Sequence, residues 1–281
     1  MKGLMAHRIW LALLPLILAT SAEAEVADLD ALVAAKAGAL EVLHRKAERA
    51  LVGVAQDPSY RGYFKAHSDQ HRHELKERID RISLEAQNKF DVGEMCLINE
   101  NGHEISRIVE GEIAHDLSTE EAAAIFFKPA FALAPRNVYV SPIYMSPDVN
   151  RWVIAYVTPI EVDGEKKAIL HYEHELKTYQ DLLAEGLAGD DARFLLAVNE
   201  EGWIVADSRR EIGTVKRGDS AVLGDYFEPF EVGATSLGAL KAELGGGTSG
   251  RGTVTLDGVP HDVAWRTVKG WTLLGFEEHS G

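Results

Sequence analysis

The chain has 281 residues, 46% of them hydrophobic, and a formal net charge of −15. This acidic balance disfavours binding to nucleic-acid phosphates or anionic lipid surfaces, so we expect no nucleic-acid partner. One cysteine, Cys96, excludes an intramolecular disulfide, and its place in the apolar run 93–99 indicates a buried small residue.

Residues 1–24 have the features of a secretory signal peptide: Lys2 and Arg8, an apolar run over residues 9–19, and an Ala-x-Ala site at 22–24. The run is shorter than the ~20 residues of a spanning helix, which disfavours an uncleaved anchor. No later stretch is long and apolar enough to span a bilayer. We therefore predict a periplasmic or secreted protein, cleaved after Ala24.

Two helices are predicted next. Apolar residues recur at three- and four-residue steps over 26–56, which predicts one long amphipathic helix. Asp57 and Pro58 interrupt it, and a second helix is predicted over residues 68–88. Together these helices form a predicted stalk, residues 25–90.

Residues 138–176 predict three consecutive strands, at 138–145, 151–160 and 166–176, each rich in β-branched and aromatic residues. Asp163-Gly164 lies between the second and third, and Gly accepts the positive φ of a tight turn. The segment is therefore predicted to be an antiparallel meander.

The chain also contains an internal repeat. Asn99-Glu100-Asn101-Gly102 and Asn199-Glu200-Glu201-Gly202 each lie between two apolar runs. Each precedes an insert, at 118–134 (with a helix predicted to start at Ser118) and at 221–244. Strands follow the second insert at 252–256, 259–267 and 271–277, and a helix near 176–184 joins the halves. Two copies of one PAS-like plan are predicted.

The order of several short motifs resembles the membrane-distal module of double Cache sensor domains. In chain order these motifs are Phe126-Phe127-Lys128-Pro129, Tyr-Val-Ser-Pro, Tyr144, Thr158-Pro159 and Asp-Gly. The resemblance implies an α+β fold: a long N-terminal helix plus two tandem PAS-like modules, each an antiparallel sheet flanked by helices. It places the ligand-binding module at 91–176 and the membrane-proximal-type module at 177–281. It also implies ligand sensing and signal transduction, including chemotaxis.

In the Cache arrangement one sheet face meets the helices and the other faces a pocket roofed by the insert. On the central strand Trp152 and Tyr156 share one face, and Arg151 shares the other with Val153. Aromatic walls with a few polar groups suit a small polar ligand. The ligand-binding residues expected from this resemblance are Arg107, Phe126, Phe127, Lys128, Tyr144, Ser146, Arg151, Trp152, Tyr156 and Glu173.

One Cache subfamily recognises amino acids through an Arg-x-Trp-Tyr segment, a later Tyr and acidic residues. Phe126 and Phe127 stand at the Trp-Tyr positions, Ala124 at the Arg position and Ser146 at an Asp position, whereas Tyr144 matches. Without that Arg, bidentate capture of a carboxylate would need another cation. Arg107, Lys128 or Arg151 are the candidates, so the resemblance implies a pocket but no particular ligand.

Two clusters have residue types that bind metal: His67, Asp69, His71, His73 and Glu74, and the weaker set His171, Glu173 and His174. A solvated helix end explains the first equally well, and only His171 and Glu173 share a strand face in the second. We assign no metal and no cofactor. No nucleophile, zinc-protease or dinucleotide motif is present, so no enzyme is predicted.

These patterns predict an exported, stand-alone sensory protein that presents its ligand to a membrane receptor, kinase or transporter, since no signalling region is expected after the last strand. The alternative is an envelope interaction scaffold whose first module is filled by aromatic side chains and has no cavity.

Overall fold

The computed structural model describes residues 29–90, 93–187, 189–190, 192–212, 222–232, 235–243, 246–256 and 258–279. The predicted signal peptide, residues 1–24, lies outside these residues, as do residues 221, 233–234 and 244 of the predicted second insert, 221–244. Within these ranges, no helix has the length and hydropathy that a membrane span requires.

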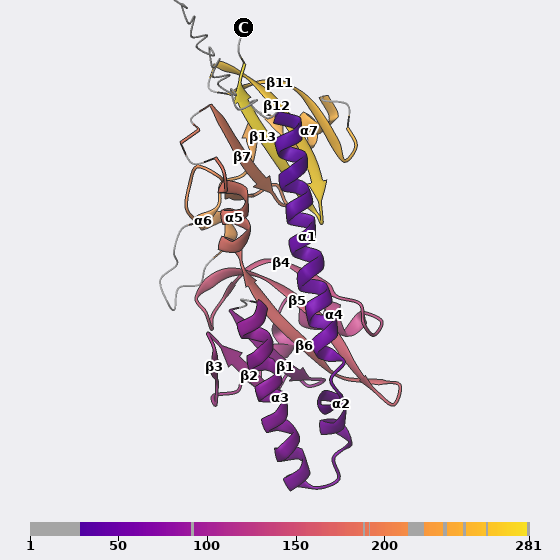
Figure 1. Ribbon diagram of the computed structural model, residues 1–281. Coiled ribbons are helices and arrows are strands. Elements are labelled where there is room, and N and C mark those ends of the chain that lie inside the picture. Colours follow the sequence, from indigo (N-terminus) through magenta and orange to yellow (C-terminus); the bar gives the residue numbers. More distant parts are fainter. Residues whose placement is uncertain are drawn as a thin grey trace, which may run out of the picture.

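Helix α1 (Leu29–Ala55) runs along both sheets of the molecule (Figure 1). It contacts β5 and β6 of the first sheet and β12 and β13 of the second. One stripe of the helix is buried, at steps of three and four residues: Leu29, Val33, Ala37, Leu40, His44, Ala47, Leu51 and Ala55. The amphipathic helix predicted over 26–56 is confirmed over its described residues.

A short helix, α2 (Pro58–Lys65), precedes α3 (Asp69–Phe90). The sequence pattern predicts only a break in the helix at Asp57 and Pro58. The Asp57 carboxylate accepts a hydrogen bond from Ser59 N at 2.8 Å, and Pro58 occupies the first helical turn. Both features start a helix, so the break is also an N-cap.

The first sheet has six antiparallel strands in the order β3-β2-β1-β6-β5-β4. The predicted meander 138–176 is confirmed as β4, β5 and β6, with Asp163 at φ 52° and Gly164 at φ 86° in the tight turn. The strands are β1 (Glu94–Asn99), β2 (Glu104–Val109), β3 (Glu112–Ile113), β4 (Tyr139–Ser146), β5 (Arg151–Val162) and β6 (Glu165–Glu175).

Helix α5 (Leu176–Ala184) leads to a five-stranded sheet in the order β11-β12-β13-β7-β8. The first sheet has the matching order β4-β5-β6-β1-β2, so both halves share one topology and the predicted α+β fold is confirmed. The remaining elements are β7 (Arg193–Val198), β8 (Ile204–Asp207), α6 (Leu223–Tyr226), β9 (Glu231–Val232), β10 (Thr235–Ser236), α7 (Leu237–Glu243), β11 (Ser249–Leu256), β12 (Val259–Val268) and β13 (Trp271–Glu278).

The repeated Asn-Glu-x-Gly turn has the same geometry in both copies. Asn99 Oδ1 accepts backbone N–H bonds from Asn101 at 2.9 Å and His103 at 3.0 Å. Asn199 Oδ1 accepts the equivalent bonds from Glu201 at 3.1 Å and Trp203 at 2.8 Å. The side chain of the first Asn thus closes each turn, which explains why the two segments look alike in sequence.

The insert of the first module differs from its prediction, because no helix begins at Ser118. Instead a 3₁₀ turn (η1, Glu121–Ala123) precedes α4 (Phe127–Ala132). The Ser118 N–H donates to the Glu104 carboxylate at 2.6 Å, and the Glu121 N–H donates to Gly102 O at 3.0 Å. These bonds tie the segment to the sheet before a helix can form.

The two faces of the first sheet have different covers. Helices α1 and α3 contact one face, and α4 contacts β5 and β6. Ile154 and Tyr156 of β5 belong to the core that includes α1, whereas Ala155 and Val157 belong to a separate core with Phe127. The face under α4 and the insert is called the outer face below.

Candidate ligand-binding site

A cavity of about 590 Å³ lies over the outer face, which is within the size range of small-molecule sites. We call it the outer-face cavity. Its floor comes from β1, β2 and β6, one wall from β4, and its roof from residues 120–126 of the insert. Val222 and Leu223 of the second module reach its edge.

The lining of this cavity is acidic. Six carboxylates line it, and no Lys or Arg does so within the described part of the chain: Glu94, Glu104, Glu120, Glu121, Asp148 and Glu173. Glu94 and Glu173 are almost fully buried, at 3% and 2% exposed. Burying uncompensated negative charge is costly, so this arrangement favours a positively charged occupant.

Strand pairing assembles the centre of the floor. Glu94 and Cys96 of β1 lie opposite Glu173 and His171 of β6, respectively. Since alternate residues of a strand share a face, all four side chains lie on the outer face. Tyr144 on β4 donates its hydroxyl to Glu173 at 2.5 Å. Residues far apart in sequence therefore meet in one polar cluster.

Arg107 of β2 lies beside this cluster and is 9% exposed. Its positive charge is already paired with carboxylates. Its guanidinium is 3.8 Å from Glu94, 3.5 Å from Glu104 and 3.4 Å from Asp148. It also contacts the exposed Asp116 at 3.3 Å. Four carboxylates around one cation leave an excess of negative charge, and Arg107 is not free to capture a ligand carboxylate.

Burial shifts the titration of the cluster. It raises the pKa of Glu173 to about 7 and raises the pKa of Glu94 well above its usual range, with the neighbouring carboxylates adding to the effect at Glu94. Burial lowers the pKa of His171 to about 3. Burial and the adjacent Glu94 and Glu104 raise the pKa of the Cys96 thiol well above its usual range, so this thiol is a poor nucleophile.

Of the residues expected from sequence, four line the outer-face cavity: Phe126, Tyr144, Trp152 and Glu173. The Phe126 ring stacks on His171 with ring centroids 4.2 Å apart. Phe127 is not part of the cavity lining, and its ring packs against Phe131 with the centroids 4.8 Å apart. Ser146 is fully buried and hydrogen-bonds the Glu173 side chain.

The other expected residues lie elsewhere. Lys128 is exposed on α4. Arg151 is 49% exposed and pairs with Glu110 at 3.0 Å and with Glu175. Tyr156 points to the helix-covered face and hydrogen-bonds His44 of α1 at 2.5 Å, so it is absent from the cavity. Its strand face was ambiguous in sequence, because either face of β5 could have met the helices.

Sequence reasoning missed several cavity residues, above all Glu94, Glu104 and Asp148. Cys96 was expected to be a small apolar residue; it is buried as expected, but its sulfur contacts two carboxylates. The available signal was a Glu at the first position of two strands whose residues are mostly apolar, EMCLIN and EISRIV. A carboxylate at such a position needs a partner or a ligand.

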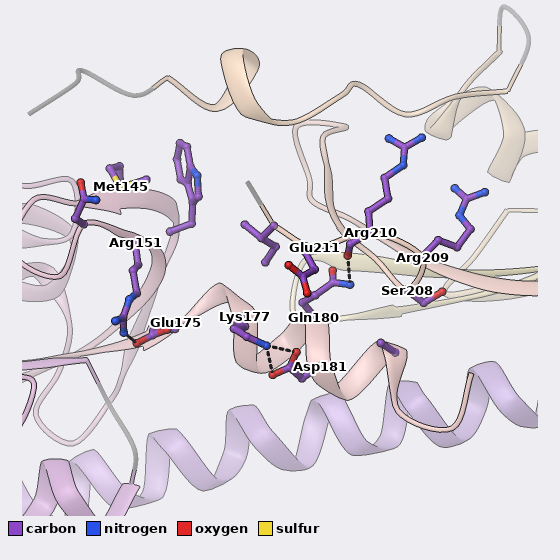
Figure 2. A pocket seen from close by; sticks show the side chains of 14 residues that line it. Met145, Arg151, Glu175, Lys177, Gln180, Asp181, Ser208, Arg209, Arg210 and Glu211 are labelled. Carbon is purple, nitrogen blue, oxygen red and sulfur yellow. Dashed lines mark hydrogen bonds and ion pairs between the residues drawn. The ribbon is translucent and has the colours of Figure 1, made fainter. Parts of the chain in front are cut away.

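A second cavity, of about 670 Å³, lies between the modules (Figure 2). Its charged groups are largely paired: Arg151 with Glu175, and Lys177 with Asp181 at 2.6 Å. Arg210 pairs with a surface carboxylate of the second module at 3.2 Å. Exposed pairs of this kind need no ligand to satisfy them, so the outer-face cavity is the stronger candidate.

The histidine cluster of α3 is solvated. His71 and His73 are 57% and 71% exposed and lie 3.7 Å and 3.4 Å from Glu74 and Glu77 on the same helix. Such i,i+3 and i,i+4 pairs are ordinary helix-surface contacts. In the second cluster, His171 and Glu173 line the cavity, whereas His174 lies on the other face beside Tyr179.

The chain has the two-module fold that the double Cache resemblance implied. Helix α1 runs along two sheets of matching topology, and a cavity lies under the insert of the first module. Comparison with solved structures confirms this fold. The sensory domain of the Campylobacter jejuni chemoreceptor Tlp3 aligns with a TM-score of 0.68 and 14% identity, over 88% of this chain and 90% of that one.

The Tlp3 sensory domain with isoleucine bound aligns at TM-score 0.64 and 15% identity, over 88% of this chain and 89% of that one. The ligand-binding domain of the Pseudomonas fluorescens chemoreceptor CtaA in complex with L-serine aligns at 0.55 and 13%, over 88% and 94%. These identities show the fold alone. No protein-family model and no curated protein sequence matches the chain.

Proposed function

We propose that this chain is an exported Cache-type sensor that binds a small, positively charged ligand in the outer-face cavity. The observation that carries the proposal is the lining of that cavity: six carboxylates, with the nearby Arg107 already paired to four acidic groups. A cationic group entering the cavity would favour the ionised forms of Glu94 and Glu173, whose pKa values burial raises, and would offset their negative charge.

The fold supports a sensory role. The structural relatives Tlp3 and CtaA are chemoreceptor domains whose structures contain isoleucine and L-serine, respectively. An amino acid carries an ammonium group that carboxylates recognise, but this cavity offers no unpaired cation for its carboxylate among the residues described. We therefore propose a ligand whose recognised group is cationic.

The proposal includes the organisation expected from sequence: a signal peptide at 1–24, a ligand-binding module at 91–176 and a second module at 177–281. It also includes presentation of the bound ligand to a membrane receptor, kinase or transporter, outside the cytoplasm. The scaffold alternative is not favoured, because it requires a filled first module, whereas a cavity of about 590 Å³ is open there.

The proposed role is non-enzymatic. Cys96 and His171 lie opposite each other on paired strands, as in a thiol enzyme. However, the Cys96 sulfur lies 3.2 Å from Glu94 and 3.3 Å from Glu104, and two carboxylates disfavour the thiolate that a nucleophile requires.

The test is a thermal-shift screen of residues 25–281 with amines, amino acids, carboxylates, purines and divalent metals. A ligand at about one hundred times its dissociation constant adds roughly 2.7 kcal/mol of stability, which is easily measured. Glu173→Gln should remove the shift, and Glu112→Gln, on the exposed edge strand β3, should retain it. The proposal would be contradicted if both substitutions reduced the thermal shift equally, or if only anions stabilised the protein.

Presentation to a partner needs a separate measurement. Photocrosslinkers placed on the exposed surface of the chain in living cells should give more adducts with membrane proteins when the ligand is present. An equal yield with and without ligand would contradict presentation while leaving ligand binding intact.

A further inference from the structure

We propose that Glu94, Cys96 and Glu104 form a binding site for a divalent transition-metal ion of the Zn²⁺ class on the floor of the outer-face cavity. The proposal rests on the proposed function, since the metal ion would be the positively charged ligand. The proposal identifies the ligand as a metal ion, a ligand class that the sequence did not predict.

The spacing of the donor atoms fits one ion. One ligand atom from each of the three buried side chains lies within 4.8 Å of the other two. The Cys96 sulfur is 3.2 Å from Glu94 Oε1 and 3.3 Å from Glu104 Oε1. Sulfur and oxygen ligands on a tetrahedral zinc are about 3.5 Å apart, given Zn–S near 2.3 Å and Zn–O near 2.0 Å.

The surrounding hydrogen bonds orient these donors. Glu104 Oε2 accepts the Ser118 N–H at 2.6 Å and faces Arg107 at 3.5 Å, which leaves Oε1 turned toward the thiol. Metal-binding carboxylates are commonly held by such outer contacts. Glu94 and Cys96 lie within β1, between β2 and β6, so the backbone that carries them is fixed on both sides.

His171 supplies an independent sign of a missing partner. It lies opposite Cys96 on β6, lines the same cavity, and its side chain is 3% exposed. Its Nδ1 is buried and has no hydrogen-bond partner among the described residues. The other ring nitrogen, Nε2, lies 3.3 Å from the Tyr144 hydroxyl. Because buried ring nitrogens are normally hydrogen-bonded, the unpaired Nδ1 beside the three donors indicates a missing occupant of the cavity.

The donor types favour a metal ion over an ammonium group. A thiol is a weak hydrogen-bond acceptor and gives an ammonium group little. A Zn²⁺ ion, in contrast, would displace the thiol proton to solvent, and thiolate and carboxylate ligands together suit that ion. Arg107 does not neutralise the site, because Asp116 and Asp148 share its charge at 3.3 Å and 3.4 Å. The cluster can therefore accept a dication.

The experiment measures Zn²⁺ binding to residues 25–281 by equilibrium dialysis after treatment with a chelator. We expect one tightly bound ion per chain, and Co²⁺ in its place should give a thiolate-to-cobalt charge-transfer absorption. Cys96→Ser and, separately, the isosteric Glu104→Gln should each weaken Zn²⁺ binding by at least about 100-fold, since loss of outer contacts alone costs about 10- to 100-fold.

Two matched controls complete the design. Glu112→Gln removes an exposed carboxylate from the same sheet, and His73→Ala disrupts the exposed cluster of α3; both should bind Zn²⁺ like the unmodified chain. Far-UV circular dichroism and thermal melting in chelator establish that each variant is folded. Cys96→Ser alters strand β1 and Glu104→Gln alters strand β2. If one of these variants does not fold, the other still tests the site.

The proposal is overturned if Zn²⁺ does not bind, if both cluster variants bind it unchanged, or if only His73→Ala abolishes binding. An amine that stabilises the chelator-treated chain through Glu173, without any Zn²⁺ binding, would overturn the metal site and leave the proposed sensor intact. Stoichiometric Zn²⁺ binding without ligand-dependent crosslinking would support the metal site and contradict presentation to a partner.

Discussion

Lowering the pH should destabilise the protein through His44, the buried histidine of α1. Its ring lies 1% exposed between Tyr156, Tyr179 and Trp271, with centroid distances of 5.9, 5.4 and 6.1 Å. Burial, together with the positive charge of Lys269, lowers the pKa of His44 from its usual 6.5 to about 4. The folded protein therefore holds this ring neutral at pH 6, where the unfolded chain protonates it.

Because the folded pKa is the lower one, the stabilisation is complete above pH 6.5 and is lost as the pH falls towards 4. Each pKa unit corresponds to about 1.4 kcal/mol, so the full loss is about 3 kcal/mol. His44→Gln has no such titration. Its free energy of unfolding, relative to the unmodified chain, should therefore rise by about 3 kcal/mol between pH 7 and pH 4.

Urea unfolding at half-unit pH steps measures this difference, and other titrating groups cancel because both proteins share them. Parallel stability curves for the two proteins over this range would refute the reasoning. They would mean that water or a neighbouring group solvates the protonated ring within the fold.

Two glycines of the repeated turn should respond differently to alanine. A Cβ at Gly102 (φ 81°) would lie 2.3 Å from Ala122 N, whereas one at Gly202 (φ 90°) would meet no atom within 4 Å. In urea unfolding we expect Gly102→Ala to cost about 3 kcal/mol and Gly202→Ala about 1 to 2 kcal/mol; equal costs would be inconsistent with the clash. Gly275→Ala places a Cβ 2.4 Å from Val33 Cγ2 and should cost about 1 to 3 kcal/mol, partly recovered by adding Val33→Ala. An additive double variant would show that helix α1 does not press on this strand.

Features that depend on neighbouring residues were predictable from the sequence. The turns at Asn99 and Asn199 close on their own side chains, so their sequence determines their shape. Asp163-Gly164 fixes the hairpin of the meander for the same reason. These local signals were sufficient to predict the repeat, the antiparallel strands and hence the two-module fold.

The candidate site depends on strand register, which local patterns do not specify. Glu94 meets Glu173 only because β1 pairs with β6 in one particular alignment. A shift by one residue would turn either side chain to the helix-covered face. Tyr156 was expected in the cavity because alternation identifies two faces of a strand without showing which one the helices cover. Only the packing of α1 resolves that ambiguity.

The first helix of the fold completes its contacts with the last strands. Asp30 accepts a bond from Arg266 at 3.0 Å, across 236 positions of sequence, and Glu48 pairs with Lys269 across 221. During synthesis, the apolar stripe of α1 around Val33 therefore lacks its contacts with β12 and β13 until those strands exist. We expect the two sheets to mature at different times: the first needs residues only up to β6, whereas the second cannot close around α1 earlier than its final strand. The N-terminal part of α1 therefore waits for its partner strands after the first sheet has formed.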